Sequence, residues 1–270
     1  QPAITKHIQE LEAAYQTRLF DRQGSRISLT EAGKLLLEHC ERILEDYKRL
    51  EYEMHLLHNE YTGGLKLGAS TTVAQYVLPP LLASFIGKFP HVNLSLLNGN
   101  SREIEAALQE HRIDLGFVEG VFRLPNIKYT TFLKDELVAV VRTGSKLAIG
   151  EEITPEELLH LPLVLRERGS GTLDVFERAL QQHNIKLSSL QVLMYLGSTE
   201  SIKLFLEHTD CLGIVSIRSI TRELYSGQLR VVEIKDMPML RDFSFAQPQG
   251  QESGLAQVFM QFAMHYNNKL

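Results

Sequence analysis

A seven-residue repeat of large side chains runs from about residue 30 to residue 61, and it restricts the fold more than any other feature of the chain. It consists of every seventh residue and the residue four positions after each, namely Leu36, Cys40, Ile43, Tyr47, Leu50, Met54, Leu57 and Tyr61. Such a repeat places one apolar seam along a helix and is typical of two helices that wrap around each other. We therefore expect a dimerising rod. The alternative is a single amphipathic helix packed on its own domain.

Both ends of this helix carry recognisable signals. Thr30 can cap the first turn, and Ser28 with Glu31 has the spacing of a capping box. Gly63 and Gly64 follow the repeat, and glycine often lies just past a last helical turn. The residues between the seam positions are mostly charged, as on a solvated face. These signals predict one linker helix over residues 30–62.

Composition limits the classes of protein that the chain can belong to. A length of 270 residues suits two or three compact units, and 44% hydrophobic residues suffice for a real core. No run of about 18 apolar residues occurs, so we expect no membrane span. The net charge of −5 gives no overall basic field, so contacts with nucleic acid must come from a few placed residues. Because the chain begins at Gln1, we expect a fragment or a processed form.

Cysteine usage points to a reducing compartment. The chain has two cysteines, Cys40 and Cys211, which cannot form a disulfide framework. We expect reduced thiols and a cytoplasmic protein, with Cys211 in the core.

The first 29 residues resemble part of a nucleic-acid-binding head. A helix is predicted over residues 1–15, with an apolar stripe on one face and polar side chains that suit bases and phosphates on the other. Two short apolar runs on either side of Gly24 then predict a two-stranded wing. The candidate DNA-contacting residues are Gln1, Pro2, Thr5, Lys6, Arg22 and Arg26. The alternative for the helix is a polar face that is simply hydrated.

From Gly64 onward, predicted strands alternate with predicted helices. Strands are expected over residues 65–69, 92–97, 114–118, 131–132, 137–141, 163–165, 192–196, 212–215, 229–234 and 243–245. Helices are expected over residues 74–89, 101–111, 155–160, 173–183, 200–208, 217–225 and 255–266. Residues 66–72 are echoed by 194–200, and residues 114–118 by 211–215. The pattern predicts two doubly wound α/β subdomains with mostly parallel sheets.

Small polar residues gather at four predicted strand-to-helix junctions, where α/β proteins bind ligands. The candidate ligand-binding residues are Ser70, Thr71, Thr72, Asn98, Asn100, Glu119, Arg166, Ser170, Thr172, Ser198 and Thr199. Each junction taken alone can be a helix cap. Together they predict a site for a small anion, with Arg166 or Arg168 as the charged partner.

Catalytic signals are missing from the sequence. It contains no G-x-S-x-G, no H-E-x-x-H and no complete phosphate-binding loop. His55 and His58 have a spacing that could place them on one helix face with Glu51, but interface or solvent-facing histidines are far commoner than metal ligands. We expect neither an enzyme nor a cofactor.

The run QPAITKHIQELEAAYQTRLFDRQGSRISLTEAGKLLL closely resembles the winged helix-turn-helix of LysR-type transcriptional regulators. Members of that family carry two more helices before this point, so we expect the fragment to bind DNA poorly and its parent protein to bind double-stranded DNA. The resemblance also implies a homodimer or homotetramer formed through the linker helix. Two readings from other classes are a free solute-binding protein, which would be a monomer without a seam, and an α/β enzyme.

The resemblance continues through the rest of the chain, where the family has an effector-binding domain like a periplasmic binding protein. It implies a partial head over 1–29, a linker helix over 30–62 and an effector-binding domain over 63–270. Lobe I would comprise about 63–141 and 241–270, and lobe II about 142–240, with crossings near 140–143 and 236–242. The loop 166–172 resembles one found in family members that sense metabolites of carbon or sulfur assimilation. A small-molecule effector between the lobes is expected.

Overall fold

The computed structural model describes residues 2–23, 26–58, 61–120, 123–147, 150–249 and 254–267. The chain divides into two compact units, residues 1–60 and 61–270. Among the described residues, no helix is both long enough and apolar enough to cross a membrane.

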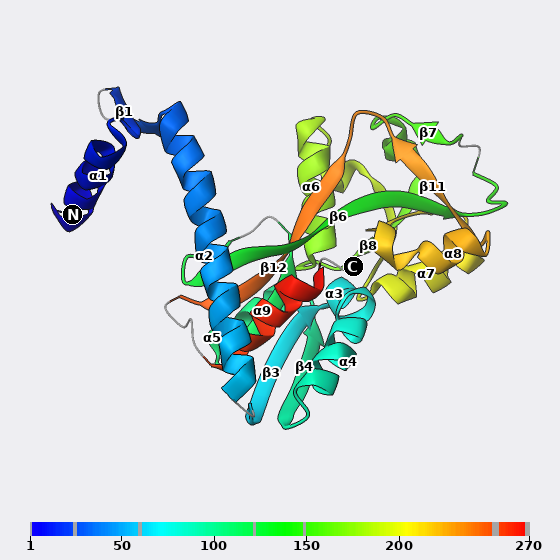
Figure 1. The fold of residues 1–270 in the computed structure, drawn as a ribbon. Coiled ribbons are helices and arrows are strands. Elements are labelled where there is room, and N and C mark those ends of the chain that lie inside the picture. Colours follow the sequence, from blue (N-terminus) through cyan, green and yellow to red (C-terminus); the bar gives the residue numbers. More distant parts are fainter. Residues whose placement is uncertain are drawn as a thin grey trace. The chain divides into compact units, whose positions relative to one another are not determined.

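The first unit contains a helix, a hairpin and a long helix in that order (Figure 1). They are α1 (Pro2–Tyr15), β1 (Phe20–Gln23), β2 (Arg26–Leu29) and α2 (Glu31–His58). β1 and β2 pair antiparallel, as expected for a wing. The helix, the wing strands and the long helix predicted from the sequence are thus confirmed. Gly24, between the two strands, lies outside the described residues.

Two polar side chains and one glycine organise this unit. Glu12 Oε1 of α1 accepts a hydrogen bond of 2.8 Å from the backbone N–H of Leu19. Thr30 Oγ1 accepts from the N–H of Gly33 at 3.0 Å and donates to the carbonyl of Arg18 at 2.7 Å, so Thr30 caps α2 as predicted. A Cβ at Gly33 would overlap the carbonyl oxygen of Leu19, so the start of α2 approaches the wing as only glycine allows.

The second unit is built on a mixed sheet in which two parallel groups of strands are joined by two long antiparallel strands. The first group has the order β4 (Val92–Gly99), β3 (Gly63–Ser70), β5 (Leu115–Glu119), and the second has the order β10 (Leu212–Ser216), β8 (Pro162–Arg166), β9 (Gln191–Leu196). The joining strands, β12 (Met239–Pro248) and β6 (Ile127–Arg142), lie side by side between the groups (Figure 1). β11 (Leu229–Ile234) extends the sheet along β6 and pairs with β7 (Glu152–Ile153).

Helices and short 3₁₀ turns connect the strands. The α-helices are α3 (Thr71–Tyr76), α4 (Leu78–Lys88), α5 (Ser101–Gln109), α6 (Gly171–Gln182), α7 (Thr199–His208), α8 (Thr221–Tyr225) and α9 (Leu255–Asn267). The 3₁₀ turns are η1 (Glu157–His160), η2 (Leu187–Ser189) and η3 (Ile217–Ser219). The helix predicted over 74–89, with an interruption in its first part at Pro79 and Pro80, forms as two helices that divide at Val77, because the prolines that follow suit only a first helical turn.

Alternate residues of the strands face two different cores, which is the signature of a doubly wound fold. On β8, Leu163 and Leu165 pack in a cluster with Phe176 of α6, whereas Val164 packs in a second cluster with Ile202 of α7. The first group of strands behaves in the same way. Phe117 of β5 packs against Phe245, with ring centroids 4.9 Å apart, while the next residue, Val118, belongs to a cluster containing residues of α5. The predicted α/β fold class is therefore confirmed.

β6 departs from the prediction. The sequence suggested two strands, over 131–132 and 137–141, whereas the structure has one continuous strand of 16 residues. Between the two predicted strands lies the charged run Lys134-Asp135-Glu136, and buried strands seldom carry charges. Asp135 is nevertheless buried, and a cation from the neighbouring strand β12 neutralises it. β12 itself extends well beyond the predicted residues 243–245.

Candidate functional site

Several of the predicted ligand-binding residues meet where β3 and β8 end and α3 and α6 begin. Ser70 is the last residue of β3, Thr71 the first of α3, and Arg166 the last of β8. Arg166 Nη2 donates to Thr71 Oγ1 at 3.4 Å, and Thr71 Oγ1 donates to the carbonyl of Gly99 at 3.2 Å. The sequence therefore correctly placed side chains about a hundred positions apart at one edge of the sheet.

Arg166 is the central cation of this edge, and its side chain is only 1% exposed. Its Nε donates to Glu167 Oε2 at 2.8 Å, and its Nη2 donates to Glu167 Oε1 at 3.0 Å and to the carbonyl of Gly197 at 3.3 Å. The two-point contact with Glu167 holds the guanidinium in one orientation. Within the described part of the chain, its remaining terminal nitrogen, Nη1, is buried and has no hydrogen-bond partner.

Ser70 carries a second unmatched polar atom. Its Oγ is buried, makes no cap to α3, and meets no hydrogen-bond partner among the residues that the structure describes. A buried donor without a partner costs about 1–3 kcal/mol, so such atoms are rare in folded proteins. Unmatched donors on Ser70 and Arg166, at the same edge of the sheet, indicate a place where a polar ligand supplies the acceptors.

Three other predicted ligand residues are instead engaged with one another. Thr72 Oγ1 and Thr172 Oγ1 donate to Glu119 Oε1 at 3.3 and 3.4 Å. Glu119 Oε2 lies 3.1 Å from Arg241 Nη1, which also donates to Thr172 Oγ1 at 3.0 Å. All four side chains are buried. Glu119 is therefore the counterion of Arg241, and the two threonines complete its coordination.

The same arginine holds a second buried carboxylate. Arg241 Nε donates to Asp135 Oδ2 at 2.7 Å, and Ser216 Oγ donates to Asp135 Oδ1 at 2.7 Å. Neither Arg241 nor Asp135 was predicted from the sequence as part of a site. The signal in the sequence was a few charged residues inside each strand, which is also what an exposed strand face looks like.

The remaining predicted residues act mainly as helix caps. Asn100 accepts from the N–H of Glu103 at 3.0 Å in a capping box at α5. Ser170 accepts from the N–H of Leu173 at 3.2 Å at α6, and Ser198 from the N–H of Ser201 at 3.1 Å at α7. Thr199 is buried at the start of α7, and Asn98 is exposed at the end of β4.

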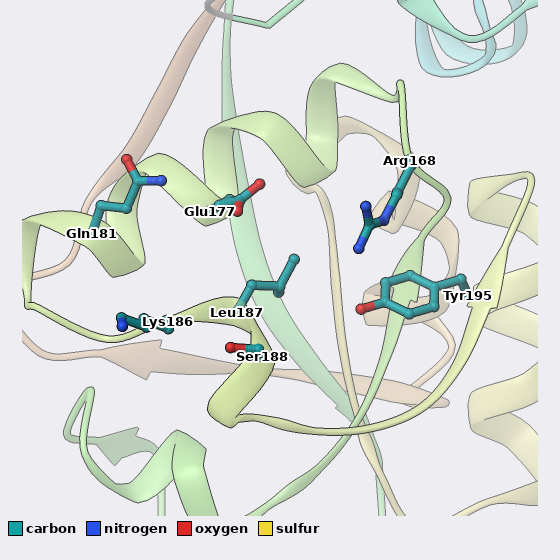
Figure 2. A pocket seen from close by; sticks show the side chains of 7 residues that line it. All are labelled: Arg168, Glu177, Gln181, Lys186, Leu187, Ser188 and Tyr195. Carbon is teal, nitrogen blue, oxygen red and sulfur yellow. The ribbon is translucent and has the colours of Figure 1, made fainter.

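Arg168 belongs to a different place on the molecule. It lines a surface pocket of about 320 Å³ together with Glu177, Gln181, Lys186, Leu187, Ser188 and Tyr195. Figure 2 shows its guanidinium beside the ring of Tyr195, across from Glu177 of α6. None of the predicted ligand-binding residues lines this pocket, whereas Arg166 contacts Thr71 at the sheet edge.

In the first unit, two of the predicted DNA-contacting residues can be located. Thr5 and Lys6 lie on α1 and are exposed, and Lys6 Nζ is 3.8 Å from Glu10 Oε1. Gln1 and the side chains of Pro2, Arg22 and Arg26 fall outside the described residues, as do those of His55 and His58. The described residues include no cluster of side chains that could hold a metal ion.

Comparison with known families covers nearly the whole chain. Residues 1–34 match the bacterial regulatory helix-turn-helix protein, lysR family, and residues 58–267 match the LysR substrate binding domain. The chain is 33% identical over 234 residues to the uncharacterized HTH-type transcriptional regulator YeiE of Escherichia coli (strain K12), an alignment that covers 87% of this chain and 77% of YeiE.

Two solved structures share the fold of the second unit. The Synechocystis PCC6803 CcmR regulatory domain in complex with 2-PG is 27% identical, with a TM-score of 0.69, and the match covers 77% of this chain and 99% of that domain. The effector binding domain of QuiR in complex with shikimate has a TM-score of 0.67 at 20% identity, covering 77% and 98% of the two chains.

The charge network makes a testable prediction about stability. Replacing Arg241 with alanine leaves Glu119 buried without its cation and Asp135 with only the more distant Arg218, 3.8 Å away, which should lower the free energy of unfolding by about 3–5 kcal/mol. Arg112→Ala is the control, because its ion pair with Glu110 is exposed and should contribute at most about 1 kcal/mol. Urea unfolding followed by circular dichroism measures both. Equal losses in the two variants would contradict the structural role of Arg241.

Proposed function

The chain belongs to the family of LysR-type transcriptional regulators and carries their effector-binding domain, and from this premise we propose that its effector is a small anion bound by Arg166 and Ser70. The observation that carries the proposal is the pair of buried, unmatched donors, Arg166 Nη1 and Ser70 Oγ. An anionic oxygen accepts hydrogen bonds from both kinds of donor, and its charge favours the guanidinium.

The open donors, and not an excess of positive charge, favour an effector with one principal anionic group. Glu119 and Arg241 balance each other, and Asp135 makes a second contact with Arg241. Arg166 is paired with the partly exposed Glu167 and keeps a buried donor, Nη1, without a hydrogen-bond partner among the described residues. Arg241 Nη2 also lacks such a partner, but it lies 2.7 Å from Asp135 Oδ2. The CcmR and QuiR domains, in complex with 2-PG and shikimate, share this fold and support a small-molecule site. In this proposal the protein regulates and does not catalyse.

We further propose the domain division expected from the sequence, with lobe I over about 63–141 and 241–270 and lobe II over 142–240. The two parallel groups of strands, each with its own cores, support this division, and β6 and β12 are the strands that pass between them. Arg166 and Thr71 come from opposite groups, so the effector would lie between the lobes.

The effector site can be tested with two conservative variants. Ser70→Ala removes an unmatched hydroxyl, so it should weaken anion binding about tenfold without lowering the free energy of unfolding. Arg166→Lys keeps the charge but loses the Nη1 donor, so it should weaken binding at least as much. Calorimetry with sulfate, phosphate and 2-PG measures the affinities, and Ser188→Ala, an exposed serine, is the control. If none of the three anions binds, or if the variants bind like the wild type, the proposal is wrong.

The linker helix supports dimerisation through its heptad seam. Ile43 is 67% exposed and Leu50 is 53% exposed, and Tyr47 and Met54 between and beyond them are also exposed. Four large side chains in register on one face of α2 match the pattern of helices that pair. The side chain of Leu57 lies outside the described residues.

A charge placed in the seam should dissociate the dimer. Leu50→Glu puts like charges opposite each other at the centre of a paired helix, so the variant should sediment as a monomer at concentrations where the wild type is a dimer. Leu35→Glu introduces the same charge at an exposed leucine outside the seam and should leave the sedimentation coefficient unchanged. A wild-type chain that is monomeric at all concentrations would contradict the dimer.

We propose that α1 contacts DNA, because its exposed Thr5 and Lys6 suit the major groove. In this proposal the regulator acts in the cytoplasm. If Lys6 neutralises one phosphate, Lys6→Ala in the parent protein, with the N-terminal residues restored, should weaken binding and reduce the slope of log affinity against log salt by about 0.9 on a duplex of arbitrary sequence. Lys66→Ala, which removes an exposed lysine from the other unit, is the control. Fluorescence anisotropy in a salt series measures the slope, and an unchanged slope would remove Lys6 from the interface.

A further inference from the structure

The atoms proposed to bind the effector are closed off from solvent in this structure. Ser70 Oγ and Arg166 Nη1 are buried, so a ligand reaches them only after the two groups of strands move apart. Two hydrogen bonds deep inside the unit oppose that movement, from Arg166 to Thr71 and from Thr172 to Glu119. A backbone hydrogen bond of 3.4 Å from the N–H of Arg102 to the carbonyl of Gly169 also spans the two groups. A further link, between Tyr76 and Glu200, lies closer to solvent than the buried ones.

Tyr76 and Glu200 join α3 to α7. The Tyr76 hydroxyl donates a short hydrogen bond to Glu200 Oε1. Tyr76 is only partly buried, and the side chain of Glu200 is 47% exposed. α3 begins at Thr71, beside the candidate site, and α7 begins at Thr199, so the link joins the two helices whose first residues lie at the sheet edge.

A buried lysine holds this link in place. Lys203 Nζ lies 2.7 Å from Glu200 Oε1 and 2.7 Å from Glu223 Oε1, and it donates to the carbonyl of Ser219 at 3.0 Å. It also lies 5.3 Å from the centroid of the Tyr76 ring. The lysine thus fixes both members of the Tyr76–Glu200 pair from one side.

The protonation states suit a strong hydrogen bond at neutral pH. Burial, then the hydrogen bond to Glu200, raise the pKa of Tyr76 well above its ordinary value, so the phenol stays a donor. Burial alone would raise the pKa of Glu200, but hydrogen bonds from Lys203 and Tyr76 outweigh it and lower that pKa, so the carboxylate stays ionised.

We propose that Tyr76 and Glu200 form a latch between α3 and α7, and that the latch opens before the effector reaches Arg166 and Ser70. Its role in effector entry rests on the function proposed above. Because water can replace the hydroxyl at a half-exposed carboxylate, this link breaks more readily than the buried ones. The latch therefore opens first and adds to the barrier that an anion must cross to enter and leave, and Tyr76 and Glu200 are positioning residues.

Tyr76→Phe tests the latch because it removes the hydroxyl and keeps the ring against Lys203. Hydrogen exchange of the full chain without ligand should become about two- to tenfold faster in peptides covering α3 and α7, and stay unchanged in α9. Tyr225→Phe is the matched control, since Tyr225 is 93% exposed and should change nothing. Exchange at the wild-type rate in α3 and α7 overturns the proposal.

Rates of anion binding test the second half of the proposal. With sulfate as the probe, stopped-flow measurements should show association and dissociation both accelerated by a similar factor in Tyr76→Phe, with a smaller change in affinity. Accelerated exchange with unchanged association would overturn the gating role. If no anion binds the wild type, the anionic effector fails, and the exchange result alone decides whether the latch exists.

Discussion

The fold of the second unit depends on one arginine. Arg241 sits in β12, the strand that lies between β5 and β6, and it neutralises Glu119 at the end of β5 and Asp135 in the middle of β6. Without that cation, a long strand with a buried carboxylate at its centre would be unstable, because an isolated buried charge costs several kcal/mol. The ion pairs thus permit two strands to run uninterrupted between the two groups of the sheet.

The buried polar residues divide into two sets with different roles. The set around Arg241 is paired internally: Glu119 has its cation and two hydroxyl donors, and Asp135 has its cation and Ser216. Glu119 Oε2 and Arg241 Nη2 form no hydrogen bond with the described residues, but they lie 3.1 and 2.7 Å from opposite charges. The set around Arg166 and Ser70 retains unmatched donors. A satisfied network holds a structure together, whereas unmatched donors give affinity to whatever supplies the acceptor. The proposed latch combines features of both sets: the Tyr76 hydroxyl has its hydrogen-bond partner, Glu200, but this carboxylate is open to water.

The first unit shows a similar contrast, between a turn whose polar groups are hydrogen-bonded and a helix face whose apolar side chains are exposed. The turn from α1 to the wing and into α2 is closed by Glu12, Thr30 and Gly33. The seam of α2, in contrast, leaves large apolar side chains exposed. Apolar surface of this length and register is typical of an interface, and the regulator proposed here needs one to place two heads on DNA.

The sequence alone determined whatever depends on local periodicity and on the order of elements. The heptad seam, the wing, the cap at Thr30 and the alternation of strands and helices follow from side-chain spacing, which the chain carries with it. The edge of the sheet where Ser70, Thr71 and Arg166 meet was also predictable, because parallel strands end together. Tertiary structure decided which polar residues are matched. Asp135 in its continuous strand is matched by Ser216, 81 positions away, and Tyr76 is linked to Glu200, 124 positions away. Glu119 pairs with Arg241 of another strand, and no local pattern in the sequence relates the two. A buried charge or hydroxyl finds a hydrogen-bond partner only if folding brings one within about 3 Å of it.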